Sequence, residues 1–167
     1  MSKTRIAVAG AGYIGLAHRE VAQKSASDGV SAVVDPSPAA KAHADAAGVP
    51  LYTTLAELFA KDKPDGVVLA TPNPLHVPHA LECIAAGVPM LLEKPIAQTV
   101  AEAERLVRAA DEAKAKILIG HHRAHSPIMA KAKQVVDSGV LGRLGVVSRR
   151  EVQELTRRVE TLADSLR

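Results

Sequence analysis

Three glycines, Gly10, Gly12 and Gly15, stand between a short apolar run and the first helix-forming stretch of the sequence. In this order the first glycine permits a tight turn, the second lets the backbone approach a pyrophosphate, and the third lets helix and strand pack closely. The helix that begins at Tyr13 and Ile14 offers free N–H groups and a partial positive charge to phosphates. The spacing therefore predicts a phosphate-binding loop.

A carboxylate, Asp35, ends the second expected strand, 20 residues after Gly15. At that place it can accept hydrogen bonds from the adenosine ribose hydroxyls, and it would repel a 2′-phosphate. Because no arginine stands beside Asp35 to receive such a phosphate, NAD is favoured over NADP as the cofactor. The alternative is that Asp35 only ends the strand as a turn residue before Pro36.

Short apolar runs alternate with helical segments, the arrangement of βαβ units around a parallel sheet. The expected strands are residues 5–10, 31–35, 67–71, 89–93 and 116–120, and the expected helices are residues 13–24, 39–47, a segment capped by Thr54, 78–86, 99–114 and 127–138. Thr54 and Thr99 each precede a glutamate by three residues, which is the spacing of a capping box. Right-handed crossovers make a doubly wound, Rossmann-like α/β fold the simplest architecture.

The composition and net charge of the chain restrict the classes of protein to which it can belong. The 167 residues carry a net charge of +3 and contain only two tyrosines and one phenylalanine, so we expect no nucleic-acid partner. A single cysteine, Cys83, excludes an intrachain disulfide and fits a reducing cytoplasm. No apolar run approaches the roughly 20 residues of a spanning helix. We therefore expect a soluble, cytoplasmic protein with no membrane partner.

Six segments of the chain together resemble the Gfo/Idh/MocA oxidoreductases, relatives of glucose–fructose oxidoreductase and inositol 2-dehydrogenase. They are, in order, GAGYIGLAH, VVDPSP, ATPNPLH, AAGVPMLLEKPIA, GHHRAHSP and SGVLGRLG, between about residues 5 and 145. Their order and ordinary spacing are more specific than any single motif. The resemblance implies an NAD-dependent dehydrogenase that acts on a sugar, a cyclitol or another polyol.

The Glu-Lys-Pro motif of that family lies beside the nicotinamide, and it corresponds here to Glu93, Lys94 and Pro95. The resemblance implies that Lys94 is catalytic. An ammonium group can hydrogen-bond a developing alkoxide, and a desolvated lysine can relay a proton. Without the family context, Lys94 would be interpreted as a surface lysine before a turn.

Two further segments correspond to family loops around the nicotinamide and the substrate. The residues that resemble the loop around the nicotinamide ribose and ring are Thr71, Pro72, Asn73 and His76. For Asn73 and His76 the alternative is a role in turn formation and helix capping. The family's HHR segment enters the substrate cleft, which implies that His122 and Arg123 contact substrate. His79 shares a helix face with His76, but no carboxylate or cysteine cluster accompanies them, so we expect no metal site.

The end of the chain departs from the family pattern. We expect residues 1–120 to form the dinucleotide-binding domain, 121–150 the vestigial start of a truncated second α+β domain, and 151–167 an amphipathic helix. That helix is predicted from an a/d stripe with spacings of 3, 4, 3 and 4, formed by Val152, Leu155, Val159, Leu162 and Leu166. The stripe can pack on this chain's own sheet or pair with a partner helix in a homo-oligomer.

Two functions of different classes stay open. The first is an oxidoreductase that transfers a hydride between nicotinamide and a secondary alcohol of a small-molecule sugar, cyclitol or polyol. The second is a non-catalytic NAD-binding module that lacks the substrate domain and self-associates through its C-terminal helix. The Glu-Lys-Pro and HHR segments favour the enzyme, whereas the loss of resemblance after Arg150 favours the module. The identity of the substrate is not determined by these residues.

Overall fold

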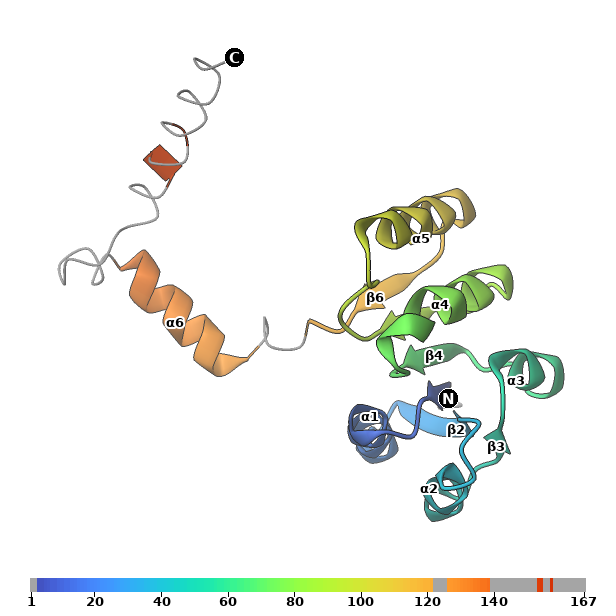
Figure 1. The fold of residues 1–167 in the computed structure, drawn as a ribbon. Helices are drawn as coiled ribbons and strands as arrows, with labels where there is room; N and C mark the ends of the chain where they lie inside the picture. Colours follow the sequence, from blue (N-terminus) through green and yellow to red (C-terminus); the bar gives the residue numbers. More distant parts are fainter. Residues whose placement is uncertain (1–2, 122–125, 139–152, 155–156, 158–167) are drawn as a thin grey trace. The chain divides into compact units, whose positions relative to one another are not determined.

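We analysed a computed structural model that describes residues 3–121, 126–138, 153–154 and 157 (Figure 1). The chain divides into two compact units, residues 1–120 and residues 121–167, and each is described by itself. The residues of the expected C-terminal stripe, Val152 to Leu166, lie outside the described residues. The helix over residues 151–167 and the boundary at residue 150 therefore stay predictions.

A parallel sheet in the order β3-β2-β1-β4-β5-β6 forms the centre of the first unit (Figure 1). Its strands are β1 (Thr4–Ala9), β2 (Asp28–Val34), β3 (Leu51–Tyr52), β4 (Gly66–Leu69), β5 (Met90–Leu92) and β6 (Ile117–Ile119). Neighbouring strands pair in parallel throughout. The chain runs outward from β1 to β3, returns to the other side of β1 and then runs outward to β6. The doubly wound, Rossmann-like α/β fold predicted from the sequence is confirmed.

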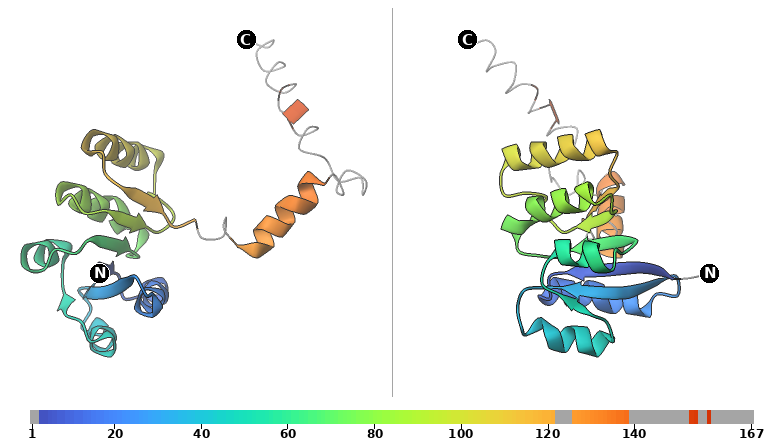
Figure 2. Two further views of the ribbon diagram at one scale, coloured as in Figure 1. Left: turned by 180° about the vertical axis from the view of Figure 1, so that it is seen from behind. Right: turned by 90° about the vertical axis from the view of Figure 1, so that its right-hand side faces the viewer.

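Helices cover both faces of the sheet (Figures 1 and 2). On one face lie α1 (Tyr13–Lys24) and α2 (Ala40–Ala47). On the other face lie α3 (Leu55–Lys61), α4 (His76–Ala85) and α5 (Val100–Ala113). A 3-10 turn, η1 (Asn73–Leu75), leads into α4. Arg19 Nη1 donates to the His43 carbonyl at 2.8 Å, which ties α1 to α2. Right-handed crossovers require this division, because the chain moves along the sheet in opposite directions from β1.

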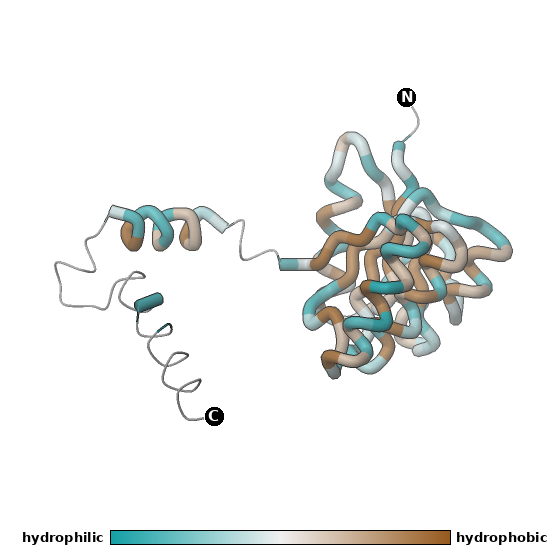
Figure 3. The backbone as a smooth tube through the Cα atoms, turned by 90° about the horizontal axis from the view of Figure 1, so that it is seen from above, coloured by the Kyte–Doolittle hydropathy of each residue, from teal (hydrophilic) through white to brown (hydrophobic). Residues whose placement is uncertain are grey.

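Small and branched aliphatic side chains fill the core, as the scarcity of aromatic residues requires. Its buried members come from the strands and from the helices that pack on them, and they include Ala7, Ala9, Leu55, Leu58, Val67, Leu69, Leu92 and Leu106. The hydrophobic segments run through the middle of this unit (Figure 3). The central strands are nearly all apolar because both of their faces are covered by helices.

Two strands differ most from the sequence prediction, and the others differ by one or two residues at their ends. The strand β3 was not predicted, because two residues are too few for a recognisable pattern, and its place is set by pairing with Val33 and Val34 of β2. The strand β2 begins at Asp28 rather than at Ser31. The segment between α1 and β2 is therefore shorter than the predicted bounds imply, because pairing with the first residues of β1 extends β2 through Asp28 and Gly29.

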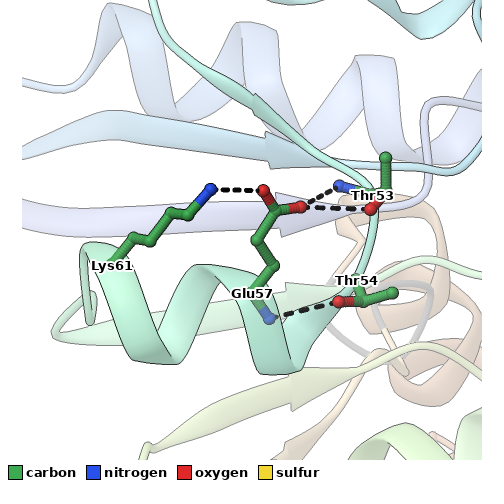
Figure 4. A network of polar contacts seen from close by, with 4 residues as sticks. All are labelled: Thr53, Thr54, Glu57 and Lys61. Carbon is green, nitrogen blue, oxygen red and sulfur yellow. Dashed lines mark hydrogen bonds and ion pairs between the residues drawn. The ribbon is translucent and has the colours of Figure 1, made fainter.

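The N-termini of α3 and α5 are both capped by threonines, as the spacing predicted. In α5 the reciprocal capping box is complete. In α3 the Thr54 hydroxyl accepts the Glu57 N–H, but the Glu57 carboxylate reaches one residue further back and accepts the N–H of Thr53 at 3.0 Å (Figure 4). Its other oxygen accepts from Lys61 Nζ at 2.8 Å. One carboxylate thus connects the start of α3 with its last turn.

The second unit contains α6 (Pro127–Asp137), which begins as predicted with a proline in its first turn. Ser126 caps this helix by accepting the Met129 N–H at 3.2 Å. Hydrophobic and hydrophilic residues alternate around it (Figure 3), and Ile128, Ala132 and Val135 share one apolar groove. No helix among the described residues is long and apolar enough to cross a membrane.

Candidate functional site

The carboxyl ends of the central strands bring three loops to one edge of the sheet. Backbone pairing continues one residue beyond the strands, with Gly10 N–H donating to Val34, Ala70 N–H to Ala9 and Gly120 N–H to Leu92, each at 2.8 Å. The strand order reverses between β1 and β4, so the glycine loop and the loop after β4 leave the sheet in opposite directions. Such a switch point is where ligands bind in open α/β sheets.

The three glycines of the first loop are required for different reasons. Gly10 has φ +96°, and a β-carbon there would lie 2.4 Å from the Ala70 carbonyl oxygen. At Gly15 a β-carbon would lie 1.8 Å from the Gly10 oxygen, whereas at Gly12 it would meet no atom within 4 Å. No side chain caps the N-terminus of α1. The chain's own packing thus accounts for Gly10 and Gly15, while Gly12 leaves open space before uncapped N–H groups, which fits a bound pyrophosphate.

The half-buried Asp35 joins the end of β2 to the glycine loop. Its Oδ2 accepts the Ala11 N–H and its Oδ1 accepts the Ser37 N–H, both at 2.8 Å. The carboxylate therefore orders the turn after β2 and also holds the phosphate-binding loop. Each carboxylate oxygen has a second lone pair, so these contacts leave acceptor capacity for a ribose hydroxyl.

A second part of the site is a pocket of about 160 Å³ at the ends of β4 and β5. Its lining residues are Ile14, Ala70, Thr71, Asn73, His76, Glu93 and Lys94. All except Ala70 are residues that the sequence predicted for the site. Tyr13, 86% exposed on the first turn of α1, and the exposed Pro72 do not line it. His122 and Arg123 lie outside the described residues.

Two histidines hold the loop after β4. The helix α4 begins at His76 rather than at Pro78, because η1 leads into it. The ring of His76 is 1% exposed, with Nε2 2.9 Å from the Thr71 carbonyl oxygen and Nδ1 2.6 Å from that of Pro95. Each ring nitrogen thus lies within hydrogen-bond distance of a carbonyl oxygen, one in the loop after β4 and one in the Glu-Lys-Pro segment. His79 Nδ1 lies 3.3 Å from the Thr71 hydroxyl, and burial lowers the pKa of His79.

Glu93 is buried, 6% exposed, next to the exposed Lys94. Its Oε1 lies 2.7 Å from His18 Nε2, and its Oε2 accepts the Lys94 N–H at 3.2 Å. Burial raises the pKa of Glu93, but the hydrogen bonds from His18 and the Lys94 backbone outweigh it, so the pKa is lowered. The peptide bond between Lys94 and Pro95 is cis. His18 was not among the residues predicted for the site, although it ends the GAGYIGLAH segment, eight residues after Gly10.

Other parts of the described chain offer no rival site. No group of three histidine, cysteine, aspartate or glutamate residues that could hold a metal occurs in the ranges the structure describes. A larger cavity of about 720 Å³ lies on the face of the sheet that carries α1, with Ile6, Val68 and Leu91 among its lining residues. It contains none of the residues predicted for the site.

The fold, the glycine loop and the switch point together define a dinucleotide-binding domain of the Rossmann type. Residues 4–121 match the model of the GFO_IDH_MocA oxidoreductase family with an NAD-binding Rossmann fold. The chain therefore belongs to the Gfo/Idh/MocA family. The resemblance inferred from the motifs is confirmed. The family model describes an NAD-binding Rossmann fold, so the cofactor expected from the sequence, NAD, is confirmed as well.

Relatives extend well beyond the length of this chain. MocA, the rhizopine catabolism protein of Rhizobium meliloti, is 32% identical over 148 residues, which cover 89% of this chain and 47% of that protein. Inositol 2-dehydrogenase of Corynebacterium glutamicum is 32% identical over 149 residues, covering 86% and 44%. The crystal structure of GenD2 from gentamicin A biosynthesis, in complex with NAD, superimposes with a TM-score of 0.77 at 31% identity, covering 83% and 40%. The chain thus spans a little under half the length of these curated relatives.

Proposed function

We propose that this chain binds NAD as the cofactor half of an oxidoreductase acting on a secondary alcohol of a sugar, cyclitol or other polyol. The observation that carries the proposal is the pocket in which Ile14, from the helix behind the phosphate-binding loop, meets Glu93 and Lys94. Membership of the family and the 32% identity to an inositol 2-dehydrogenase support the reaction class.

Different residues of the chain are proposed to contact different parts of the cofactor. The open space at Gly12 and the uncapped start of α1, with Tyr13 and Ile14, are suited to the pyrophosphate. Asp35 is proposed to accept hydrogen bonds from the adenosine ribose and to repel a 2′-phosphate. The residues proposed for the nicotinamide ribose and ring are Thr71, Pro72, Asn73, His76 and Glu93.

The chemistry proposed for Lys94 is proton handling and charge stabilisation. Bound NAD supplies a nicotinamide ring that accepts a hydride. Oxidation of the alcohol to a ketone would remove this hydride from its carbon and a proton from its oxygen. The Lys94 side chain hydrogen-bonds this oxygen as negative charge develops and relays the proton to solvent. His122 and Arg123 are proposed to contact the substrate.

Calorimetric titration with NAD and NADP tests the cofactor assignment on the native chain and on Asp35→Ala. We expect NAD to bind more tightly than NADP, and Asp35→Ala to weaken NAD binding about tenfold, the equivalent of one hydrogen bond to a charged group. Asp45→Ala, which removes an exposed carboxylate paired with Lys41 on α2, is the matched control and should bind NAD like the native chain. No binding of either cofactor to the native chain would refute the proposal.

The reaction is tested separately from binding. We expect NADH to form when myo-inositol or another polyol is added with NAD, and Lys94→Ala to abolish its formation while NAD still binds. Binding without NADH formation from a panel of cyclitols and sugars would refute the enzyme and leave the NAD-binding module as the function.

A further inference from the structure

Glu93 has a set of contacts that its place in the Glu-Lys-Pro motif does not explain. A buried carboxylate is costly unless it is paired and hydrogen-bonded. Here the partner is His18 of α1, whose Nε2 lies 2.7 Å from Oε1, and the second oxygen accepts the Lys94 N–H. His18 is itself partly covered, with 26% of its side chain exposed.

The chain also leaves room for this carboxylate from a third element. Gly120 follows β6 directly, and a β-carbon there would lie 2.8 Å from Glu93 Oε1 and 2.9 Å from its carboxyl carbon. Any larger residue would have to displace the carboxylate from His18. The position of Glu93 is therefore determined jointly by α1, β5 and the residue after β6.

The pair connects the two segments that form the pocket of about 160 Å³. Ile14, on the first turn of α1, and Lys94, whose N–H donates to Glu93 Oε2, both line this pocket. His18 lies four residues after Ile14 and therefore on the same side of α1. The contact between His18 and Glu93 thus holds the Glu-Lys-Pro segment against α1 beside the pocket.

We infer that His18 is a positioning residue for the nicotinamide end of the cofactor site, holding Lys94 in place relative to α1 through the Glu93 carboxylate. The inference rests on the proposed function. His18 acts through Glu93, whereas the adenosine and pyrophosphate end is held by the glycine loop and Asp35. Loss of His18 should therefore impair binding at one end of the cofactor only.

The ratio of the affinities for NAD and ADP-ribose measures this directly, because ADP-ribose lacks the nicotinamide. We expect His18→Leu to lower that ratio about tenfold, the equivalent of one charge-assisted hydrogen bond, with the affinity for ADP-ribose changed less than about twofold. His18→Gln, which keeps an N–H donor, should recover part of the ratio. Glu20→Gln, an exposed change on the same helix, is the control and should leave it unaltered.

A carboxyl carbon NMR titration of Glu93 tests whether His18 acts on this carboxylate, and the affinity ratio is the readout that a purely structural role would not move. In the chain without cofactor we expect the pKa of Glu93 to lie below its ordinary value, and to rise in His18→Leu, because burial persists while the His18 donor is lost. An unaltered affinity ratio in His18→Leu, or an equal loss of affinity for NAD and for ADP-ribose, would overturn the positioning role of His18 but not the proposed function. A native chain that binds neither ligand would refute the proposed function and this inference with it.

Gly120→Ala tests the same contact without altering His18. The added methyl group must push the Glu93 carboxylate away, so the NAD to ADP-ribose ratio should fall as it does in His18→Leu. This variant decides the matter if His18→Leu does not fold. A Gly120→Ala chain with the native ratio would contradict the inference.

Discussion

The two ends of the candidate cofactor site are held by different kinds of contact. The phosphate-binding loop, residues 10–15, depends on backbone space, since a β-carbon at Gly10 or Gly15 would collide with a carbonyl oxygen. The proposed nicotinamide end depends on polar side chains that contact distant parts of the chain, from His18 to Glu93, 75 positions apart, and from His76 to Pro95, 19 apart. Space determines the residue type at the first end, and a distant partner determines it at the second.

This difference predicts how each end responds to substitution. In the loop, the effects of a substitution on folding and on cofactor binding can be separated. A side chain at Gly15 would collide with the Gly10 carbonyl, whereas one at Gly12 would meet no protein atom nearby. At the proposed nicotinamide end, removal of one side chain also takes a hydrogen-bond partner from a buried group, so effects on folding and on binding accompany each other.

The largest expected effect is that of Gly15→Ala. A β-carbon 1.8 Å from the Gly10 oxygen forces the backbone to move, so we expect the free energy of unfolding to fall by about 3 kcal/mol or more. Gly12→Ala is the matched variant. We expect it to lower the free energy of unfolding by about 1 kcal/mol or less, because Gly12 is the N-cap of α1. We also expect it to weaken NAD binding at least as much as Asp35→Ala does. Denaturant unfolding and calorimetry measure the two quantities. Native NAD affinity in Gly12→Ala would contradict close approach of the pyrophosphate.

A smaller effect is expected for His76→Leu at the other end. Both ring nitrogens lie within 2.9 Å of a carbonyl oxygen, and leucine would leave those of Thr71 and Pro95 without this donor. We expect the free energy of unfolding to fall by about 1–3 kcal/mol, with weakened binding of NAD but not of ADP-ribose. His79→Leu is the comparison, since its longer contact of 3.3 Å to the Thr71 hydroxyl should matter less. Equal effects of the two substitutions would show that burial of the rings, rather than these hydrogen bonds, dominates.

The same division explains what could be predicted from the sequence. The glycine loop and the capping of α5 depend on residues close together in the chain, and Asp35 stands at the spacing from the loop that the dinucleotide-binding fingerprint requires, so the sequence shows all three. The pairing of His18 with Glu93 and the room provided by Gly120 depend on which helix and strands lie side by side, and no local spacing encodes that. The strand β3 could not be predicted for the same reason, because its two residues form a strand only through their pairing with β2.

The smallest expected effect concerns a local contact far from both ends. The hydrogen bond from Lys61, followed by those from Thr53, lowers the pKa of Glu57 to about 2 (Figure 4). Because this pKa is lowered on folding, Glu57 stabilises the fold above its ordinary pKa of 4.5, and the contribution disappears as the pH falls from 4.5 towards 2. Glu57→Gln should therefore flatten the dependence of unfolding free energy on pH in that window, measured by denaturant unfolding.

The control for Glu57→Gln is Glu104→Gln on α5, an exposed glutamate whose carboxylate lies 3.8 Å from Arg108 and which caps no helix. It should alter this pH dependence less, because only Glu57 also accepts hydrogen bonds from the backbone and hydroxyl of a threonine. Neither substitution should alter the NAD to ADP-ribose affinity ratio, since both lie outside the two ends of the site. A changed ratio in Glu57→Gln would show that capping of α3 reaches the cofactor site, and the separation of local from long-range contacts would then fail.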